Sequence, residues 1–231
     1  MGSEMCIRDR FSSGSTGSPK GVTLTHENLL ANVNAIHDGI QSPEEGDSFF
    51  SWMPLTHDMG LIGFHLTPLF KAWTHYVMPT SMFIRNPISW LRKIEQYRIS
   101  FTSSPNFGYQ YVLKNLERKA NESSVFDLSS LRIIVNGAEP ISASLCEKFT
   151  EKMQDFGLKE NVIFPVYGLA EASLAVTFTD WKKQVRSKRI KREFLGIDDT
   201  VQFTEENEKG AEFVNVGSSI LDCEVRITGS N

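Results

Sequence analysis

The amino-acid sequence predicts an α/β fold, with a mostly parallel sheet and helices on both of its faces. The first observation is an alternation of short β-prone runs with segments whose apolar residues recur at helical spacing. Repeated βα units of this kind build parallel sheets that helices cover on both sides. The second observation is size, because 231 residues with 40% hydrophobic content can bury a substantial core. From about Thr177 onward the pattern changes to shorter strands and charged loops.

The expected elements follow one another along the chain. Thr25 can cap a first helix, because its hydroxyl can accept a hydrogen bond from an amide of the first turn. Pro87 suits the first turn of a later helix, and Gly157 suits the end of the last one. The expected helices cover residues 25–40, 60–73 (with Pro68 inside), 88–99, 106–120 and 142–157. The expected strands lie within residues 47–54, 74–79, 100–105, 130–136 and 161–168.

Charge and cysteine usage exclude several classes of protein. A net charge of -4 gives no global reason to bind nucleic acid or an anionic membrane. Residues 182–192 include seven Lys or Arg, but aromatic residues are not interleaved with them, so we interpret the run as a solvated face or a carrier-protein docking surface. The three cysteines lack C-x-x-C spacing, which argues against a disulfide framework or a zinc site and favours a reducing cytoplasm. No apolar run is long enough to be an integral membrane segment.

The first ten residues, MGSEMCIRDR, are too charged for a signal peptide. We interpret residues 1–10 as a non-native leader and exclude them from the predicted fold.

A loop rich in Gly, Ser and Thr follows, with the sequence SGSTGSPKGV over residues 13–22. Glycines let consecutive amides point into one concave anion site, and hydroxyl groups add donors. Lys20 supplies a positive charge that can reach an outer phosphate. A flexible linker has a similar composition, but β-prone residues flank this loop on both sides. The spacing fits neither the Walker pattern nor the dinucleotide-binding pattern.

Three further motifs fall where strands are expected to end, which is where open α/β sheets bind ligands. They are PLTHDMG at residues 54–60, NGAEP at 136–140 and VYGLAEA at 166–172. Tyr167 offers an aromatic face, and Glu171 offers an oxygen ligand for a hard cation. Each has an ordinary structural interpretation, and His57 alone could be a satisfied structural histidine. The spacing of His57, His65 and His75 fits no standard metal-ligand pattern.

Together these four motifs resemble, in sequence and order, those of the adenylate-forming enzymes, a superfamily that includes acyl-CoA synthetases, peptide-synthetase adenylation domains and fatty acyl-AMP ligases. The resemblance implies an ATP-binding site with Mg²⁺ held by Glu171 and with His57 on the carboxylate side. It implies that the turn at Gly137, Ala138 and Glu139 packs against adenine, beside Tyr167 and Gly168. The residues implied for the phosphates are Ser13, Gly14, Ser15, Thr16, Gly17 and Lys20. Many relatives carry threonine where this chain has Ala170, so the α-phosphate contact of that residue is in doubt.

The resemblance is strongest to the fatty acyl-AMP ligase branch. It implies activation of a fatty acid to an acyl-adenylate, with an acyl carrier protein as acceptor. The alternatives are an acyl-CoA synthetase, with CoA as acceptor, and a nucleotide-binding remnant without turnover. A long polar stretch at about residues 180–212 resembles an insertion thought to hinder CoA thioester formation. Phe107, Tyr109 and Tyr111 suit either an acyl tunnel wall or ordinary core packing.

The resemblance covers residues 11 to about 227, so residues 11–231 are expected to form part of a large adenylation domain. In relatives the ribose-binding aspartate, the hinge and the small C-terminal domain with its catalytic lysine come later in the chain. The resemblance therefore implies an incomplete large domain.

Overall fold

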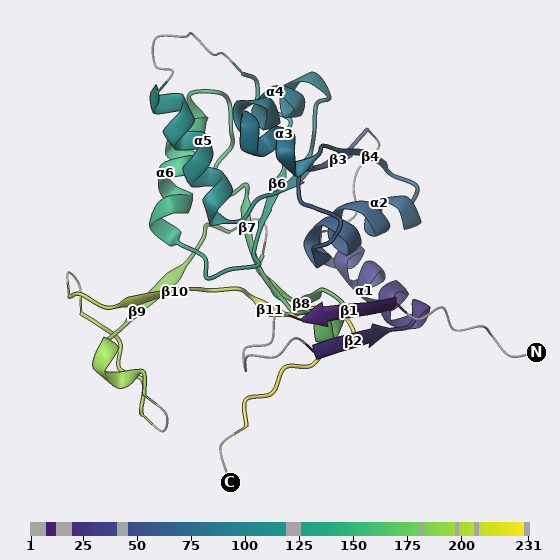
Figure 1. Cartoon of the computed structure of the whole chain (residues 1–231). Helices are drawn as coiled ribbons and strands as arrows, with labels where there is room; N and C mark the ends of the chain where they lie inside the picture. Colours follow the sequence, from purple (N-terminus) through teal and green to yellow (C-terminus); the bar gives the residue numbers. More distant parts are fainter. Residues whose placement is uncertain are drawn as a thin grey trace, which may run out of the picture.

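A seven-stranded sheet organises the molecule (Figure 1), and the strand order is β11–β8–β7–β6–β5–β3–β4. The computed structural model describes residues 8–12, 20–40, 46–118, 126–180, 183–196, 199–205 and 208–228. Strands β3, β4, β5, β6 and β7 run parallel to one another. At one edge of the sheet, β8 pairs antiparallel with β7, and β11 pairs antiparallel with β8. The strands of this sheet are β3 (Ser48–Ser51), β4 (Thr74–Val77), β5 (Phe101–Ser103), β6 (Ile133–Asn136), β7 (Ile163–Gly168), β8 (Ala175–Phe178) and β11 (Ser218–Ser219).

Helices cover both faces of the sheet, which confirms the predicted fold class. The first layer packs α1 against the two helical segments that follow β3, and the second packs neighbouring helices of the remaining βα units. The first layer consists of α1 (His26–Gly39), the π-helix η1 (Met59–Leu66) and α2 (Thr67–Phe70). The second consists of α3 (Thr80–Arg85), α4 (Ile88–Gln96), α5 (Asn106–Arg118) and α6 (Ala143–Gln154). Helix α3 was not expected from the sequence.

Helix starts follow the capping chemistry that the sequence predicts. The Thr25 hydroxyl accepts a hydrogen bond from the Asn28 amide at 3.2 Å, and the Asn28 side chain accepts one from the Thr25 amide at 3.0 Å. This reciprocal capping box satisfies amides that have no partner within the helix. Ser142 caps α6 through the Leu145 amide.

The segment 60–73 differs from the single helix expected for it. It forms the π-helix η1 followed by the short helix α2. Pro68 has no amide hydrogen and stands in the first turn of α2, a position that tolerates proline. Just before it, both the amide and the hydroxyl of Thr67 donate to the Ile62 carbonyl, the hydroxyl at 2.7 Å. The proline thus begins a new helical segment instead of extending the old one.

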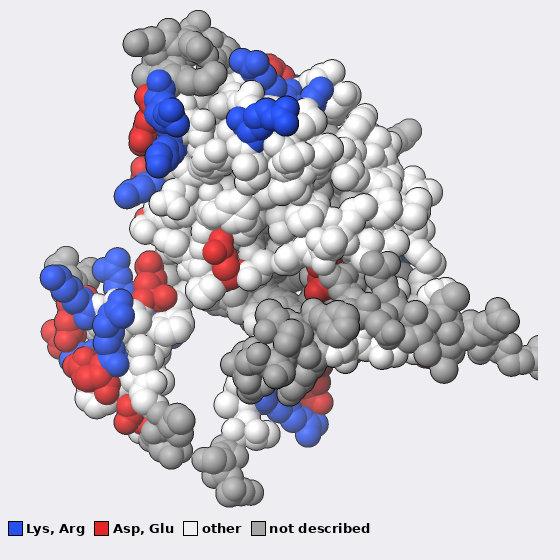
Figure 2. All heavy atoms as spheres, viewed as in Figure 1, with Lys and Arg blue, Asp and Glu red and all other residues white. Residues whose placement is uncertain are grey.

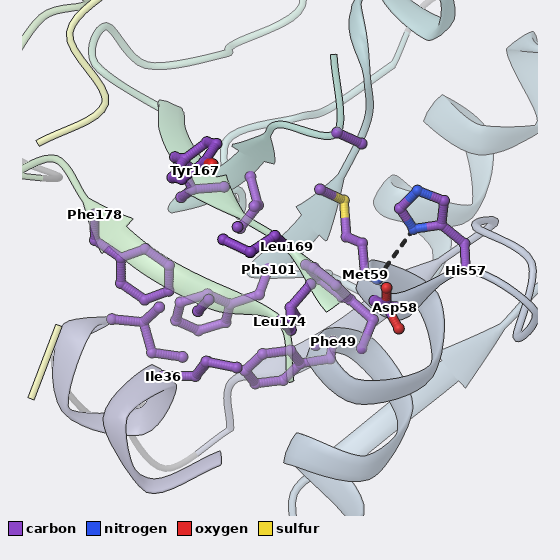
Figure 3. Close-up of a pocket in the computed structure, with 18 residues that line it drawn as sticks. Ile36, Phe49, His57, Asp58, Met59, Phe101, Tyr167, Leu169, Leu174 and Phe178 are labelled. Atoms are coloured by element: carbon purple, nitrogen blue, oxygen red, sulfur yellow. Dashed lines mark hydrogen bonds between the residues drawn. The ribbon is translucent and has the colours of Figure 1, made fainter. Parts of the chain in front are cut away.

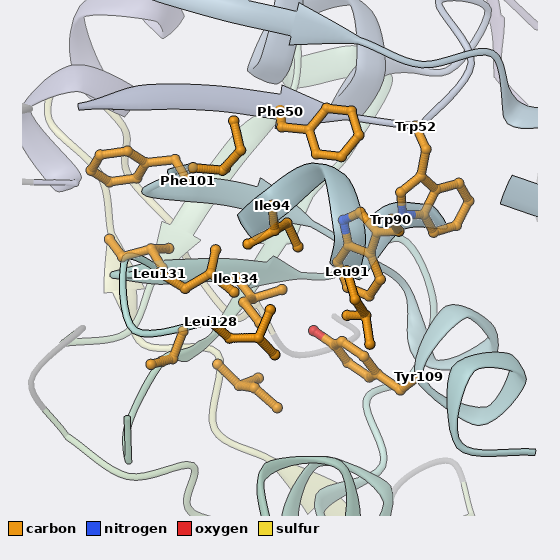
Figure 4. Close-up of a cluster of buried hydrophobic side chains, with 14 of the residues drawn as sticks. Phe50, Trp52, Trp90, Leu91, Ile94, Phe101, Tyr109, Leu128, Leu131 and Ile134 are labelled. Atoms are coloured by element: carbon orange, nitrogen blue, oxygen red, sulfur yellow. The ribbon is translucent and has the colours of Figure 1, made fainter. Parts of the chain in front are cut away.

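The main hydrophobic core lies along the sheet and under the second helix layer (Figure 4). Trp52, Trp90 and Tyr109 are fully buried there. The Trp90 indole nitrogen donates to the Thr102 hydroxyl at 3.1 Å, which satisfies its one polar atom. Tyr109 packs on Phe149, with ring centroids 4.5 Å apart. Of the two interpretations left open for Tyr109, the structure therefore favours core packing.

Two strands flank the predicted phosphate loop. β1 (Arg8–Ser12) pairs antiparallel with β2 (Lys20–Leu24), and Ser12 lies opposite Lys20. Residues 8–10 were excluded from the predicted fold, but here their backbone pairs with residues 22–24 of β2.

A two-stranded arm extends from the body of the molecule within the region expected to be an insertion. It consists of β9 (Ser187–Ile190) and β10 (Ala211–Val214), which form a sheet of their own, with the short 3-10 helix η3 (Arg192–Phe194) between them. Figure 2 shows basic and acidic side chains interleaved on this arm. Lys191 lies 3.1 Å from Glu208, and Arg189 lies 3.9 Å from Glu212. The basic run is therefore partly neutralised within the arm. Among the described helices, none is long and apolar enough to cross a membrane.

Candidate active site

The predicted phosphate loop lies between the paired ends of β1 and β2. Ser13, Gly14, Ser15, Thr16 and Gly17 lie outside the described residues. Lys20 is the first residue of β2, and its side chain is not described. Ser12 and Lys20, the residues on either side of the loop, are paired, so the two ends of the loop lie next to each other.

Glu171, the predicted Mg²⁺ ligand, lies near these strands. It belongs to the 3-10 helix η2 (Ala170–Ala172), which packs against β1. Glu171 also lines a cavity together with Thr23 and Leu24 of β2. Its side chain is exposed. Among the described residues, no group of three or more His, Cys, Asp or Glu gathers to hold a metal. A single carboxylate beside a phosphate loop still fits Mg²⁺, which is usually held by one or two carboxylates together with phosphate oxygens and water.

A separate apolar pocket of about 180 Å³ opens at the carboxyl ends of the parallel strands (Figure 3). Four of the predicted site residues line it. They are His57, Ala138, Tyr167 and Gly168. The lining residues come from α1 and η1 on one side and from β3, β5, β6, β7 and β8 on the other, so the pocket lies between the sheet and the first helix layer. The structure thus brings three of the four predicted motifs together at one cavity.

His57 lies at the start of the η1 segment, and its ring orientation is set locally. Its Nδ1 atom accepts a hydrogen bond from the Met59 amide at 3.1 Å. A neutral ring that accepts at Nδ1 carries its proton on Nε2, so His57 can act as a hydrogen-bond donor through that atom. His57 is half-buried and lines the pocket.

The turn at 137–139 is held in an unusual backbone conformation. Ala138 has φ of 72°, in the left-handed region that residues with a Cβ rarely adopt. A side chain at Gly137 would place its Cβ 2.9 Å from Val166 Cγ2, so the close approach of the turn to β7 requires glycine. Ala138 faces the pocket, whereas Gly137 and Glu139 are not among the residues that line it.

Asn106, at the start of α5, holds the segment that follows this turn. Its Nδ2 donates to the Pro140 carbonyl at 2.6 Å, and its Oδ1 accepts from the Ser142 amide at 3.3 Å. The neighbouring Phe107 amide donates to Glu139 Oε1 at 3.2 Å. The carboxylate of Glu139 therefore caps α5.

Tyr167 lies at the mouth of the pocket, at a point where the pairing of β7 with β8 is irregular. The pairing of β7 with β8 shifts register between Tyr167 and Gly168. A Cβ at Gly168 would lie 2.0 Å from the Leu174 carbonyl oxygen, so only glycine fits there. The Tyr167 side chain is 49% exposed and still lines the pocket.

Sequence reasoning missed Asn106 and the residues at the inner end of the pocket. Asn106 follows Pro105 directly after β5, and a polar residue opening a helix is a common cap, so nothing in the pattern marked it. Phe107, Tyr109 and Tyr111, which were considered for an acyl wall, are not among the pocket's lining residues.

Comparison with known proteins places this arrangement in a family. Residues 10–221 match the AMP-binding enzyme family. The chain belongs to that family. The medium-chain-fatty-acid–acyl-carrier-protein ligase TtuA of Teredinibacter turnerae is 38% identical over 168 residues, which is 73% of this chain and 26% of TtuA. The long-chain-fatty-acid–AMP ligase FadD32 of Mycolicibacterium smegmatis is 32% identical over 212 residues, which is 90% of this chain and 33% of FadD32.

Solved structures give the same relationship. The fatty acyl-adenylate ligase from Legionella pneumophila, determined in complex with acyl adenylate and pyrophosphate, superposes with a TM-score of 0.83 and 36% identity. The match covers 91% of this chain and 37% of that protein. The AMP-binding chain described here therefore spans between a quarter and two fifths of the length of these relatives.

Proposed function

We propose that the protein containing this chain activates a fatty acid with ATP, forming an acyl-adenylate and releasing pyrophosphate. The observation that carries the proposal is the apolar pocket, which opens beside His57, Ala138 and Tyr167 and ends among phenylalanine rings. An acyl tail suits its inner end, and the aromatic face of Tyr167 at its mouth suits adenine. The activities in the names of the relatives support the same proposal.

In the proposed reaction a carboxylate oxygen of the fatty acid attacks the α-phosphorus of ATP. A bond forms between that oxygen and phosphorus, and the bond from phosphorus to the bridging oxygen breaks, so pyrophosphate leaves with the electron pair. No general base is required, because a carboxylic acid with a pKa of about 4 is already ionised at neutral pH. The barrier comes largely from bringing two anions together, which amide dipoles and cations directed at the phosphates can lower.

The proposed roles divide between the two ends of the site. His57 lines the side where the fatty-acid carboxylate enters, and the turn at Gly137, Ala138 and Glu139 lies with Tyr167 and Gly168 on the adenine side. Mg²⁺, when bound, would neutralise part of the phosphate charge, and Glu171 is the side chain we propose to hold it. The phosphates of ATP are assigned to Ser13, Gly14, Ser15, Thr16, Gly17 and Lys20.

Substitution of the charged residues tests this proposal. In the complete protein, Lys20→Ala and Glu171→Ala should each slow fatty-acid-dependent pyrophosphate release on the order of 10²-fold or more, because each removes charge stabilisation of the transition state. Lys114→Ala and Glu117→Ala are matched controls, since both residues lie on the exposed surface of α5. Wild-type rates in both site variants would rule out these roles.

The acceptor that we propose for the acyl group is the phosphopantetheine thiol of an acyl carrier protein. Two observations support it: TtuA is named as an acyl-carrier-protein ligase, and the arm formed by β9 and β10 occupies the expected insertion. CoA is the alternative acceptor, which would make the protein an acyl-CoA synthetase. Because ATP and carrier proteins are cytoplasmic, we propose a cytoplasmic location.

A further inference from the structure

We infer that Phe49 sets the upper limit on the length of the acyl chain that the pocket accepts. This inference rests on the proposed function, because it assigns the apolar pocket to an acyl tail. The two ends of the pocket differ in their exposure to solvent. The residues at one end are exposed, such as Tyr167 at 49%, and those at the other are buried, such as Phe49 at 2%. A tail that enters beside Tyr167 and His57 must therefore run toward Phe49.

The inner end is closed by aromatic rings that hold one another in place (Figure 3). Phe49 and Phe101 are cross-strand neighbours on β3 and β5, and their rings stack with centroids 4.6 Å apart. On the opposite side Phe49 stacks on Trp73, with centroids 5.3 Å apart and planes within 6°.

Phe64 of η1 contacts the same ring from a third direction, with a centroid distance of 6.0 Å. A ring stacked on two sides and touched on a third has little room to rotate, so it closes the pocket as a fixed wall. Trp73 is in turn stacked on His37 of α1, with centroids 5.2 Å apart. The wall is thus supported from the sheet, from η1 and from α1.

The closed inner end of the pocket limits the chain length. The pocket has a volume of about 180 Å³, and Phe49 lines it at the buried end. An acyl tail can therefore lengthen only until its terminal methyl group meets this ring. Each methylene that the pocket buries should improve kcat/KM about fourfold, and that gain should stop when the tail reaches Phe49.

A chain-length series in the complete protein tests the inference, with kcat/KM measured by pyrophosphate release for butanoate, octanoate, dodecanoate and hexadecanoate. The wild type should peak at an acid shorter than hexadecanoate and fall at least tenfold from that peak to hexadecanoate. Phe49→Leu removes the ring from the wall and should move the peak toward longer acids. Phe50→Leu is the matched control, because Phe50 is equally buried on the same strand but is not among the pocket's lining residues. It should keep the wild-type peak.

A second variant should shift the chain-length preference in the opposite direction. It keeps the inference testable if Phe49→Leu fails to fold. Ile36 of α1 lines the pocket, so Ile36→Phe should fill it and move the peak toward butanoate. A wild-type peak at hexadecanoate, or an equal profile in all three variants, would overturn the inference while leaving fatty-acid activation intact. Absence of pyrophosphate release with every chain length would instead contradict the proposed function.

Discussion

Among single residues, His37 shows how packing against the pocket wall changes a side chain's chemistry. Its ring stacks on Trp73, behind Phe49. Burial lowers the pKa of His37 below its usual value near 6.5, the nearby Lys71 lowers it further, and Asp38 acts in the opposite direction. His37 therefore binds protons less readily in the folded protein than in the unfolded chain, so its contribution to stability decreases as pH falls through the range just below its usual pKa.

Replacing this histidine tests the linkage. His37→Phe keeps an aromatic ring against Trp73 and removes the titrating group, so its melting temperature should change less between pH 8 and pH 5.5 than that of the wild type. His26→Phe is a matched control at the exposed start of the same helix. An unchanged pH dependence in His37→Phe would show that His37 does not couple protonation to folding. The measurement is thermal unfolding followed by circular dichroism.

The sequence was enough to predict which site residues have chemically active side chains, but not how those side chains are oriented. His57, Tyr167 and Glu171 stand in short motifs, and the structure places each near a cavity. The capping role of the Glu139 carboxylate depends on Phe107 of α5, which is 32 residues away in the chain. Local sequence cannot report such a contact, so the predicted adenine turn was identified without the residues that hold it.

At the scale of elements, the turn between β6 and α6 depends on the first residue of α5. Asn106→Ala removes the donor to the Pro140 carbonyl and the acceptor for the Ser142 amide, each worth about 0.5–1.5 kcal/mol. The left-handed backbone at Ala138 should then relax, which would weaken ATP binding. We expect KM for ATP to rise several-fold in the complete protein, with a smaller change in kcat.

Two further variants separate positioning from general damage to α5. Asn106→Asp keeps the acceptor and should recover part of the ATP affinity. Asn115→Ala removes a comparable bond on the same helix, from Asn115 Nδ2 to the Tyr111 carbonyl, and should leave KM for ATP unchanged. Equal effects of Asn106→Ala and Asn115→Ala would mean that the turn is held by other contacts.

Element boundaries were predicted best where caps and periodicity agree. Thr25 and Ser142 begin helices as expected, and the βα alternation gave the parallel strands of the sheet. The π-helix η1 was not predicted, because its apolar residues are compatible with an ordinary helix. The antiparallel strand β8 follows a turn at Ser173 with positive φ, a conformation that serine does not signal.

At the scale of the whole molecule, the arm formed by β9 and β10 is attached at a narrow base. The Asn215 amide donates to the Arg186 carbonyl at 2.8 Å, so residues 187–214 can be replaced by two glycines without moving the ends. If the arm obstructs transfer to CoA, this deletion should raise acyl-CoA formation relative to acyl-adenylate. The adenylation rate should persist, because none of the arm's described residues lines the pocket.

The measurement for the arm is the product ratio with CoA present, in the complete protein and in the deletion variant. Efficient acyl-CoA synthesis by the unmodified protein would assign it to the acyl-CoA synthetases. An unchanged low ratio after deletion would mean that the arm is not the obstacle.

The pocket itself could not be derived from the sequence. Its mouth consists of motif residues, but its inner end combines Ile36, Phe49, Phe101 and Phe178 from four elements. In its local sequence each of these residues has the pattern of an ordinary core residue. Only the tertiary arrangement distinguishes residues that line the pocket from residues packed in the core. The motifs thus predicted residues that line the mouth of the pocket, and the fold was needed to find its inner end.

A structure of the complete protein with a non-hydrolysable octanoyl-adenylate analogue tests the central claim most directly. The account predicts that adenine lies between Tyr167 and the turn at Ala138, and that the octanoyl tail runs past His57 toward Phe49. An analogue whose tail occupies another cavity, or whose adenine lies away from Tyr167, would contradict it.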